Sequence, residues 1–553
     1  MSGVAKAGAN SEFRNSFGEN IFRQKYALTP EQTWAEKAHD IVKDVTTNLF
    51  QTDHQEALEA AVREMQFIPG GRYIYYAGRQ ARFYNNCYLL RGEEDTREEW
   101  GSLIRRGSDS LMSGGGIGVD YSVFRPHGAP LGRTGGKASG PIPLMHTMNE
   151  VGRNVMQGGS RRSAIYASLS WRHGDAEEFL RMKNWGQMQI APGVTVADAK
   201  RVNFNYPAPL DMTNISLNYD DAFLDAIQQG YIPETFIQNC YQACSTGEPG
   251  FSFNFGDKED ETLRNACTEV TSSDDSDVCN LGSVNLGRIS TLKEFREVVR
   301  LAAGFLVCGT ITAELPYKKV YEVRKKNRRL GLGLMGFHEW LLKRGYKYEM
   351  VPELRQWLEV YREESERSAN SLCDRLSISR PVAYRAIAPT GSIGIIAGTT
   401  TGIEPLFGVA YKRRYLTEGT RWKYEYVVDA TAEALIKEGI NPDGIETAID
   451  LVHDWEKRIK FQADVQDYVD MSISSTINLP EWGSDLNNAS RVPDFARILS
   501  SYAHRLRGFT CYPDKARGGQ PLEVVSYREA MKHKGVIFEE NEEAACKGGV
   551  CGL

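Results

Sequence analysis

A short segment near the middle of the chain combines an amide, a thiol and a carboxylate at alternate positions. It reads Asn265-Ala266-Cys267-Thr268-Glu269. If the segment is extended, Asn265, Cys267 and Glu269 share one face, with successive side chains about 6.5–7 Å apart. Such a row could address neighbouring hydroxyl groups of one small substrate. Taken alone, however, these five residues fit a polar loop with a buried cysteine better.

The chain contains ten cysteines. In a long chain without an export signal most of them should be reduced, and any pair that forms is expected to be catalytic. Four lie in apolar helical patterns and are expected in the core: Cys240, Cys244, Cys308 and Cys373.

Two further cysteines, Cys546 and Cys551, lie in an acidic, glycine-rich C-terminal tail over residues 538–553, which is expected to be mobile. Gly548 and Gly549 between them would let the two thiols meet. A zinc site is the alternative, but a single Cys-x4-Cys lacks a second ligand pair. We therefore expect a redox pair, and no metal site.

The segment 388–394 resembles a phosphate cradle. Glycines allow close backbone approach, hydroxyls can donate hydrogen bonds, and a following helix would point its N–H groups at an anion. A generic turn is the alternative, which the segment alone favours. It is not a Walker loop, because no Gly-Lys-Ser/Thr follows. The residues concerned are Pro389, Thr390, Gly391, Ser392 and Ile393.

The segment Gly331–Gly336 fits the pattern G-x-G-x-x-G. It follows a basic helical stretch instead of a strand, and no acidic residue marks a ribose site about twenty residues on. We interpret it as helix packing and not as a dinucleotide-binding turn.

The composition is typical of a large globular protein. The 553 residues are 41% hydrophobic and 25% charged, and the net charge of −6 comes without any basic tract, so a nucleic-acid polymer is not an expected partner. The N-terminus lacks the apolar core of a secretory signal. The longest apolar stretch, Leu301–Leu315, is too short and mixed to span a membrane. A cytoplasmic location, away from the membrane, is the default expectation.

The N-terminal part is predicted to be helical. Residues 1–25 are polar and indicate a flexible arm, and residues 26–71 form a helical region. Thr29 is expected to cap its first helix, with Pro30 in the first turn and Gln32 completing a capping box. A second helix is predicted over Gln55–Met65.

From residue 72 onward, short apolar runs alternate with amphipathic helical stretches. Strands are predicted at 87–90, 165–169 and 284–286, and helices at 219–229, 293–308 and 353–376. This alternation favours a large α/β domain with parallel strands. Whether the sheet is open or closed does not follow from the periodicity.

Several motifs occur in an order that identifies a family. They are Asn85–Leu90, Arg161–Ala164, Asn265–Glu269, Cys279–Leu286, Pro389–Ile393, Gly402–Pro405 and the C-terminal cysteine pair. Together they resemble the ribonucleotide reductase family, and they look most like its adenosylcobalamin-dependent class. The resemblance runs from about residue 20 to the end.

The resemblance implies a particular fold. This is a ten-stranded β/α barrel over residues 72–537, made of two five-stranded parallel halves that run antiparallel to each other. The N-terminal helical region would lack the ATP-binding cone of longer relatives.

The resemblance also implies a reaction, the conversion of ribonucleoside di- or triphosphates to deoxyribonucleotides for DNA synthesis. Cys267 would become a thiyl radical and abstract the 3′ hydrogen, since S–H and C–H bonds are similar in strength. Glu269 would act as general base and Asn265 would hold the ribose. Cys87 and Cys279 would supply two electrons and end as a disulfide.

Other residues would bind nucleotides by the same resemblance. Asn86 would join the phosphate loop at the substrate. A specificity loop would relay the identity of a bound dNTP or ATP effector to the site of the substrate base. Arg125 would contribute to the site that binds the effector phosphates. The loop residues are Gly158, Gly159, Ser160, Arg161 and Arg162.

The radical source is predicted from the C-terminal region. The segment Phe509–Asp514 has one tyrosine where subunits fed by a separate protein usually carry two, and Arg517–Leu522 resembles the cobalamin class. Adenosylcobalamin is therefore expected. The alternative is a large subunit whose radical comes from a metal-containing small subunit.

Two rival functions are a redox-active nucleotide-binding regulator and a formate-lyase relative. The first would not need Glu269, and the second would need a glycyl-radical segment.

Thioredoxin or a similar dithiol protein would recharge the tail, and a homodimer would fit an effector site at a two-fold interface.

Overall fold

The first half of a β/α barrel is made of five parallel strands. The computed structural model describes residues 12–155, 163–203, 206–417, 421–516, 522–534 and 536–539. Most residues of the five strands are buried, as expected for parallel strands covered on both faces. The strands, in order of pairing, are β2 (Cys87–Arg91), β3 (Gly116–Asp120), β4 (Ile165–Ser170), β7 (Thr213–Tyr219) and β8 (Gly250–Phe253).

The second half runs in the opposite direction. β11 (Asp277–Asn285) pairs antiparallel with β2, and β16 (Gly508–Pro513) pairs antiparallel with β8. Next to them, β12 (Leu330–Met335) is parallel to β11, and β15 (Thr476–Leu479) is parallel to β16.

Two isolated parallel bridges connect the segment 385–387 to β12 on one side and to Ile473, shortly before β15, on the other. They are Leu332↔Arg385 and Ile387↔Ile473. With this segment as its fifth member, the second half matches the predicted barrel type, in which two parallel halves run antiparallel to each other, and that fold class is confirmed. β1 (Phe67–Pro69) pairs antiparallel with β11 as an addition that was not predicted.

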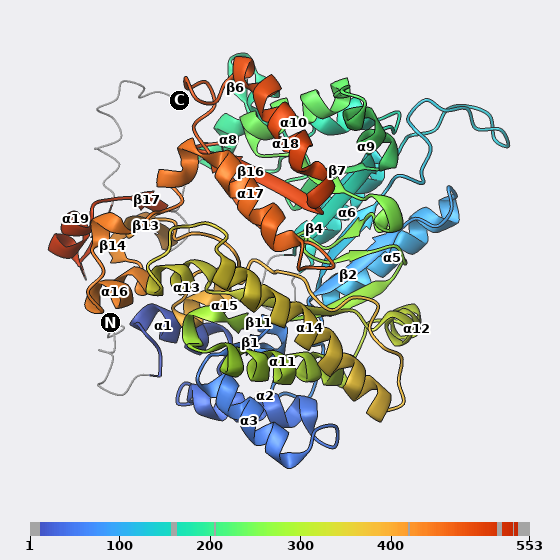
Figure 1. Cartoon of the computed structure of the whole chain (residues 1–553). Coiled ribbons are helices and arrows are strands. Elements are labelled where there is room, and N and C mark those ends of the chain that lie inside the picture. The colour runs from blue at the N-terminus through green and yellow to red at the C-terminus, as the bar shows by residue number, and fades with distance from the viewer. Residues whose placement is uncertain are drawn as a thin grey trace.

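The N-terminal helices lie below the barrel in the view of Figure 1. They are α1 (Ser16–Lys25), α2 (Trp34–Thr46) and α3 (Thr52–Arg63). The predicted start of α2 at Thr29 is wrong, because the capping box is formed by Thr33 and Glu36. Gln32 instead accepts a hydrogen bond from the Leu28 N–H, 2.8 Å away.

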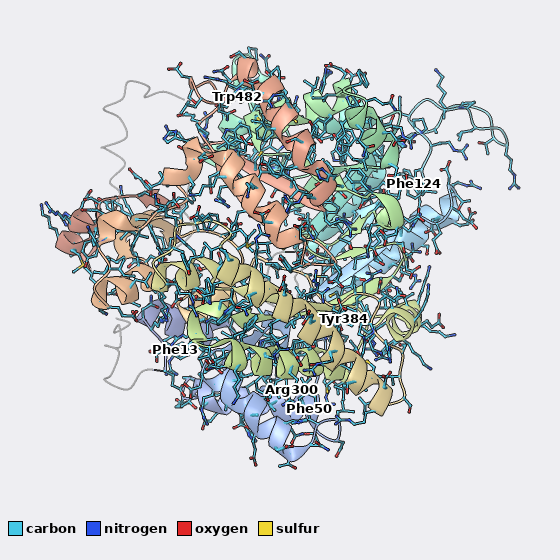
Figure 2. The ribbon with its side chains drawn as sticks, viewed as in Figure 1. Phe13, Phe50, Phe124, Arg300, Tyr384 and Trp482 are labelled. Carbon is cyan, nitrogen blue, oxygen red and sulfur yellow. The ribbon has the colours of Figure 1, made fainter. Side chains whose placement is uncertain are left out.

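The flexible arm predicted over residues 1–25 is wrong in its described part. Residues 16–25 form α1, and Phe13, which is labelled in Figure 2, lies 5.5 Å from Phe22 of this helix between ring centroids, in a stacked arrangement. Arg14 donates hydrogen bonds to the Gly398 carbonyl at 2.8 Å and to Glu339 at 2.7 Å. Contacts with residues far along the chain therefore order a segment whose own composition is polar.

Helices follow the strands and cover the barrel (Figure 1). The long helices predicted at 293–308 and 353–376 are confirmed as α11 (Leu292–Thr312) and α14 (Pro352–Arg375), which pack on each other. The four cysteines expected in the helical core are buried. None of the helices in the described part of the chain is long and apolar enough to cross a bilayer. Other covering helices are α5 (Arg97–Met112), α6 (Ile142–Asn154), α9 (Asp221–Gln228), α10 (Glu234–Thr246), α12 (Lys318–Asn327), α17 (Trp455–Gln466) and α18 (Val492–Tyr502).

A second, smaller sheet projects from the barrel on the left of Figure 1. It is antiparallel and was missed, because residues 72–537 were all assigned to the barrel. Its last strand also includes the first two residues of the expected tail. The sheet consists of β17 (Leu522–Val524), β13 (Ala410–Thr417), β14 (Arg421–Val428) and β18 (Ile537–Glu539), accompanied by α16 (Ala430–Lys437) and α19 (Tyr527–His533).

The helical interpretation of the glycine pattern at 331–336 is wrong. Leu330–Met335 is the buried strand β12. A parallel strand buried on both faces has no alternating pattern to reveal it. A Cβ on Gly331 would lie 2.3 Å from the Leu281 side chain and 3.0 Å from the Cys279 sulfur, so glycine is needed for β12 to approach β11.

Candidate active site

A short hairpin carries Cys267 into the interior of the barrel. Its strands, β9 (Leu263–Arg264) and β10 (Thr271–Ser272), pair antiparallel. A Cβ on Gly118 of β3 would lie 1.6 Å from the Arg264 carbonyl oxygen, so only glycine lets the hairpin lie this close to the barrel wall. The hairpin also shares an apolar cluster with residues of β2 and β11. The members are Cys87, Leu89, Leu263, Val270, Cys279, Leu281, Ala383, Ala386, Ala388 and Met471.

The predicted extended Asn–Cys–Glu row is wrong. The segment turns at the tip of the hairpin, where the Thr268 N–H donates to the Asn265 carbonyl at 2.9 Å and Thr268 has a φ of 70°. A single residue with positive φ reverses the chain, so the alternation of an extended strand is lost. Cys267 is exposed at the tip, whereas Asn265 and Glu269 are buried.

Asn265 connects the hairpin to β2. Its amide nitrogen donates to the sulfur of Cys87 at 3.0 Å, and its amide oxygen accepts from the Val270 N–H at 3.0 Å. One amide therefore holds the turn closed and contacts one of the predicted redox cysteines.

Glu269 is a buried carboxyl group at the end of the turn. Its side chain is 1% exposed, and no hydrogen-bond partner for Oε2 exists among the described residues. Burial raises its pKa from 4.5 to about 7, although Asn265 lowers it somewhat. A carboxyl with this pKa can take up or release a proton near neutral pH. The carbonyl of Glu269 accepts from the Ser472 N–H at 2.8 Å, which fixes the backbone.

Cys87 and Cys279 lie directly opposite each other where the two barrel halves meet. They are register partners in the pairing of β2 with β11. Opposed residues of an antiparallel pair have Cα atoms about 4.5–5.5 Å apart, within the range that a disulfide spans. Burial raises the pKa of both thiols well above the usual value, so both are protonated at neutral pH.

The predicted phosphate loop lines a cavity of about 680 Å³. Thr390 adopts a left-handed conformation, accepts a hydrogen bond from the Gly402 N–H at 2.8 Å, and precedes α15 (Gly391–Ala397). Pro389 and Gly391 face the cavity, whereas the Ile393 side chain is buried in the core and can offer only its backbone.

Sequence reasoning missed other parts of this cavity. Arg413 of β13 and Ser474, just before β15, line it together with the loop. The motif at 402–405 could have indicated that more of the chain contributes to this cavity, because Glu404 also lines it. Asn86 does not line it, and its amide oxygen is buried without a hydrogen-bond partner among the described residues.

Comparison with known proteins decides the family. A family profile described as "Ribonucleotide reductase, barrel domain" matches residues 85–239, 252–363 and 380–512. The chain belongs to the ribonucleotide reductase family. The resemblance seen in the motifs is thereby confirmed, and the chain is an enzyme of the ribonucleotide reductase type.

Relatives of this reductase cover most of its length. A vitamin B12-dependent ribonucleoside-diphosphate reductase of Mycobacterium tuberculosis is 26% identical over 99% of this chain and 84% of the relative. An enzyme of the same name from Thermoplasma acidophilum is 26% identical over 89% of this chain and 71% of the relative. An adenosylcobalamin-dependent ribonucleoside-triphosphate reductase of Euglena gracilis is 22% identical over 97% and 87%.

A second cavity of this reductase, of about 650 Å³, surrounds the predicted effector residue Arg125. Arg125 forms an ion pair with Asp95. Phe124, labelled in Figure 2, contributes an aromatic wall with Trp100. Arg125 was predicted to contribute to such a site, whereas the start of α5 was missed. Basic residues lining the cavity are Arg97, Arg125, Arg133 and Lys137.

Two predicted groups lie outside the described residues. They are the specificity-loop residues Gly158, Gly159, Ser160, Arg161 and Arg162, and the tail cysteines Cys546 and Cys551.

Proposed function

We propose that this reductase converts ribonucleoside di- or triphosphates to 2′-deoxyribonucleotides for DNA synthesis by thiyl-radical chemistry. The observation that carries the proposal is the hairpin inside the barrel. It carries the exposed Cys267 and the buried Glu269, and its Asn265 donates to the sulfur of Cys87, the register partner of Cys279. The phosphate-loop cavity offers the complementary site for the substrate phosphates.

In the first steps, the Cys267 sulfur radical takes the 3′ hydrogen atom of the ribose. Glu269 accepts the proton of the 3′ hydroxyl, a role supported by its Oε2, which has no hydrogen-bond partner among the described residues, and by its pKa of about 7. Asn265 holds the hairpin against Cys87 and orients the ribose.

The reduction then uses the cysteine pair. One thiol of Cys87 and Cys279 protonates the 2′ hydroxyl, which leaves as water. The two sulfurs together give up two electrons and join as a disulfide, and the 3′ hydrogen returns from Cys267 to the ribose. The balance is one ribonucleotide and two thiols to one deoxyribonucleotide, one disulfide and one water.

We assign adenosylcobalamin as the radical source, because the relatives from Mycobacterium tuberculosis, Thermoplasma acidophilum and Euglena gracilis are named for vitamin B12 or for adenosylcobalamin. The exposed thiol at the hairpin tip fits a bulky cofactor that must come within reach of sulfur. When bound, the cofactor supplies a carbon-centred radical by cobalt–carbon homolysis. The runner-up is a radical delivered by a metal-containing small subunit. Against it, Tyr512 of β16 has Cys511 before it and Pro513 after it, so it lacks an adjacent tyrosine.

Further partners complete the proposal. A dNTP or ATP effector occupies the cavity around Arg125, and the loop at 158–162 relays its identity to the substrate. Cys546 and Cys551 reduce the barrel disulfide and are recharged by thioredoxin or a similar dithiol. A homodimer is part of the same proposal.

The decisive experiment is anaerobic turnover of the purified chain alone, with and without adenosylcobalamin. Deoxyribonucleotide formation that requires the cofactor and no second radical-generating protein is expected. Activity that arises only with a second metal-containing protein would instead support the runner-up.

A further inference from the structure

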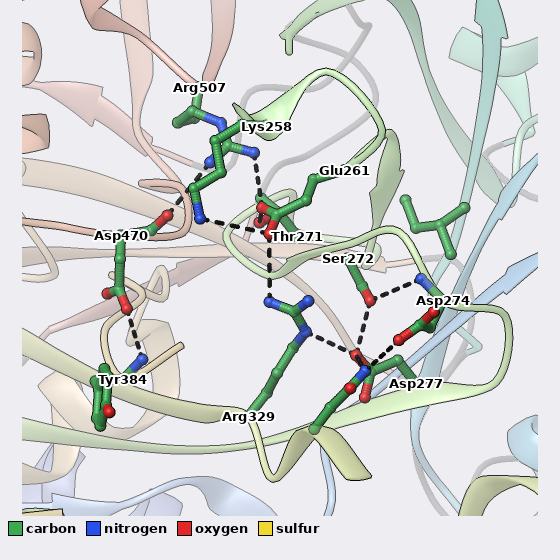
Figure 3. Close-up of polar contacts among 12 residues, drawn as sticks. Lys258, Glu261, Thr271, Ser272, Asp274, Asp277, Arg329, Tyr384, Asp470 and Arg507 are labelled. Atoms are coloured by element: carbon green, nitrogen blue, oxygen red, sulfur yellow. Dashed lines mark hydrogen bonds and ion pairs between the residues drawn. The ribbon is translucent and has the colours of Figure 1, made fainter. Parts of the chain in front are cut away.

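A chain of four alternating charges lies at the base of the Cys267 hairpin (Figure 3). Asp277 accepts from Arg329 Nε at 2.6 Å, Arg329 Nη1 lies 3.7 Å from Glu261, and Arg507 lies 3.0 Å from the other Glu261 oxygen. The four side chains are at most 13% exposed. Lys258 Nζ also lies 3.5 Å from Glu261, so each of the two buried carboxylates is paired with at least one cation.

The same carboxylates hold both strands of the hairpin. Glu261 lies just before β9, and Thr271 of β10 donates to its Oε2 at 2.7 Å. Ser272 of β10 donates to Asp277 at 2.7 Å. Because each strand has only two residues, backbone pairing alone would leave the hairpin weakly held. Side-chain contacts to the two carboxylates supply the missing connections.

The charges also join the hairpin to three strands of the barrel. Asp277 begins β11, Arg329 immediately precedes β12, and Arg507 immediately precedes β16. Asp277 and Cys279 are two positions apart on β11, so their side chains share a face. Arg329 therefore links the hairpin that carries Cys267 to the strand that carries Cys279.

Global stability alone is a poor reason for this arrangement. Burying charges carries a large desolvation cost, and well-packed apolar residues often stabilise a fold as much as a buried ion pair. Ion pairs and hydrogen bonds differ from apolar contacts in that they define direction as well as distance. In the proposed reaction the ribose lies between Cys267 and the cysteine pair, so the distance and direction between these groups must be fixed.

We propose that Arg329 is a positioning residue for the reaction, which holds the Cys267 hairpin in place relative to Cys279 by joining Glu261 to Asp277. The inference rests on the proposed function for its consequence in turnover. The mechanical part, that Arg329 orders the hairpin, stands on the contacts alone.

The test compares Arg329→Met with Arg329→Lys and with a matched control, Arg380→Met. Arg380 forms an exposed ion pair with Asp374 at 2.7 Å, so its loss should change neither activity nor hairpin order. For Arg329→Met we expect kcat to fall about 10- to 100-fold, since misplacement by about 1 Å can cost 100-fold. KM should stay within about twofold, because the phosphate-loop cavity is not lined by the four charged residues. Arg329→Lys should recover part of kcat, because a point charge can pair with Asp277 but cannot span both carboxylates.

Amide hydrogen exchange on the resting protein supplies a readout that does not depend on turnover. In Arg329→Met, peptides covering residues 258–277 should exchange faster, whereas peptides from β3 and β4 should not change. Unchanged exchange in the hairpin would overturn the proposal, and so would faster exchange throughout the barrel. A wild-type chain without reductase activity would refute the proposed function but leave the exchange result decisive for the hairpin.

A milder variant covers the case in which Arg329→Met does not fold. Thr271→Val keeps all four charges and the side-chain shape but removes the hydrogen bond from β10 to Glu261. We expect a smaller loss of kcat, faster exchange confined to the hairpin, and an unchanged thermal midpoint. Full kcat together with wild-type exchange in this variant would contradict the proposal.

Discussion

Cys87 of β2 and Cys279 of β11 are register partners at one of the two seams between the halves of the barrel. Backbone hydrogen bonds across this antiparallel pairing hold the two residues opposite each other, at a Cα separation that a disulfide can bridge. The thiols can therefore be oxidised without a rearrangement of the strands that carry them.

Mild oxidation of the isolated protein should join these two cysteines. With a small oxidant such as diamide, peptide mapping by mass spectrometry should find the Cys87–Cys279 disulfide as the main internal product. The helical cysteines Cys240 and Cys373 serve as controls and should stay reduced, because neither lies directly opposite another cysteine in a strand pairing. Dominant pairing of any other described cysteines would contradict the assignment.

The tail pair should matter only for protein reductants. Cys546→Ser should lose multiple turnover with thioredoxin as reductant, because the barrel disulfide is no longer reached. With dithiothreitol, which diffuses to the barrel directly, activity should return to near the wild-type level. Steady-state rates with the two reductants measure the difference, and equal loss with both would exclude a shuttle role.

Substitution of Cys267 should separate binding from chemistry. Cys267→Ser should abolish deoxyribonucleotide formation, because an O–H bond is too strong to form the required radical under these conditions. Nucleotide binding measured by calorimetry should be unchanged, since the phosphate-loop cavity does not include Cys267. Cys373→Ala, a change on the distant helix α14, should retain turnover. Full activity of Cys267→Ser would refute the mechanism.

The pH dependence should report Glu269. As a base it must be ionised, so kcat should rise with pH around the pKa of about 7. Glu269→Gln should remove this rise together with most of the activity. A rate that does not vary between pH 6 and 8 would speak against Glu269 as the base.

The same group should affect stability in the opposite direction. Its folded-state pKa of about 7 lies above the ordinary 4.5, so between these values the folded protein holds a proton that the unfolded chain has released. Stability contributed by this group is therefore present below pH 4.5 and falls as the pH rises toward 7. Relative to Glu269→Gln, the wild-type free energy of unfolding should drop by roughly 3 kcal/mol across this window. Urea unfolding at pH 4.5 and pH 8 measures the difference.

Gly118 should be intolerant of even a methyl group. In Gly118→Ala, the new Cβ would lie 1.6 Å from the Arg264 carbonyl oxygen, so the hairpin must move away from β3. We expect a loss of about 1–3 kcal/mol in unfolding free energy and a larger relative loss of turnover. Gly101→Ala is the matched control, because no atom lies within 4 Å of its added Cβ. Wild-type kcat in Gly118→Ala would contradict the close approach.

Local patterns predicted the regular elements better than the turns between them. The apolar runs at 87–90 and 165–169 became β2 and β4, and the amphipathic stretch at 353–376 became α14. The start of α2 was misplaced, because Thr29 and Thr33 both offer a capping sequence and only the contact of Glu36 distinguishes them. The glycine pattern of β12 was misinterpreted, because a strand buried on both faces lacks the period that identifies strands.

The sequence by itself determined the family, and through the order of its motifs it named the side chains proposed to carry the chemistry: Cys267, Glu269, Cys87 and Cys279. Only the tertiary structure decided how these groups meet. The turn at Thr268 separates an exposed thiol from a buried carboxyl, and strand register places Cys87 opposite Cys279. Such relationships depend on pairing between segments far apart in the chain, which local periodicity does not encode.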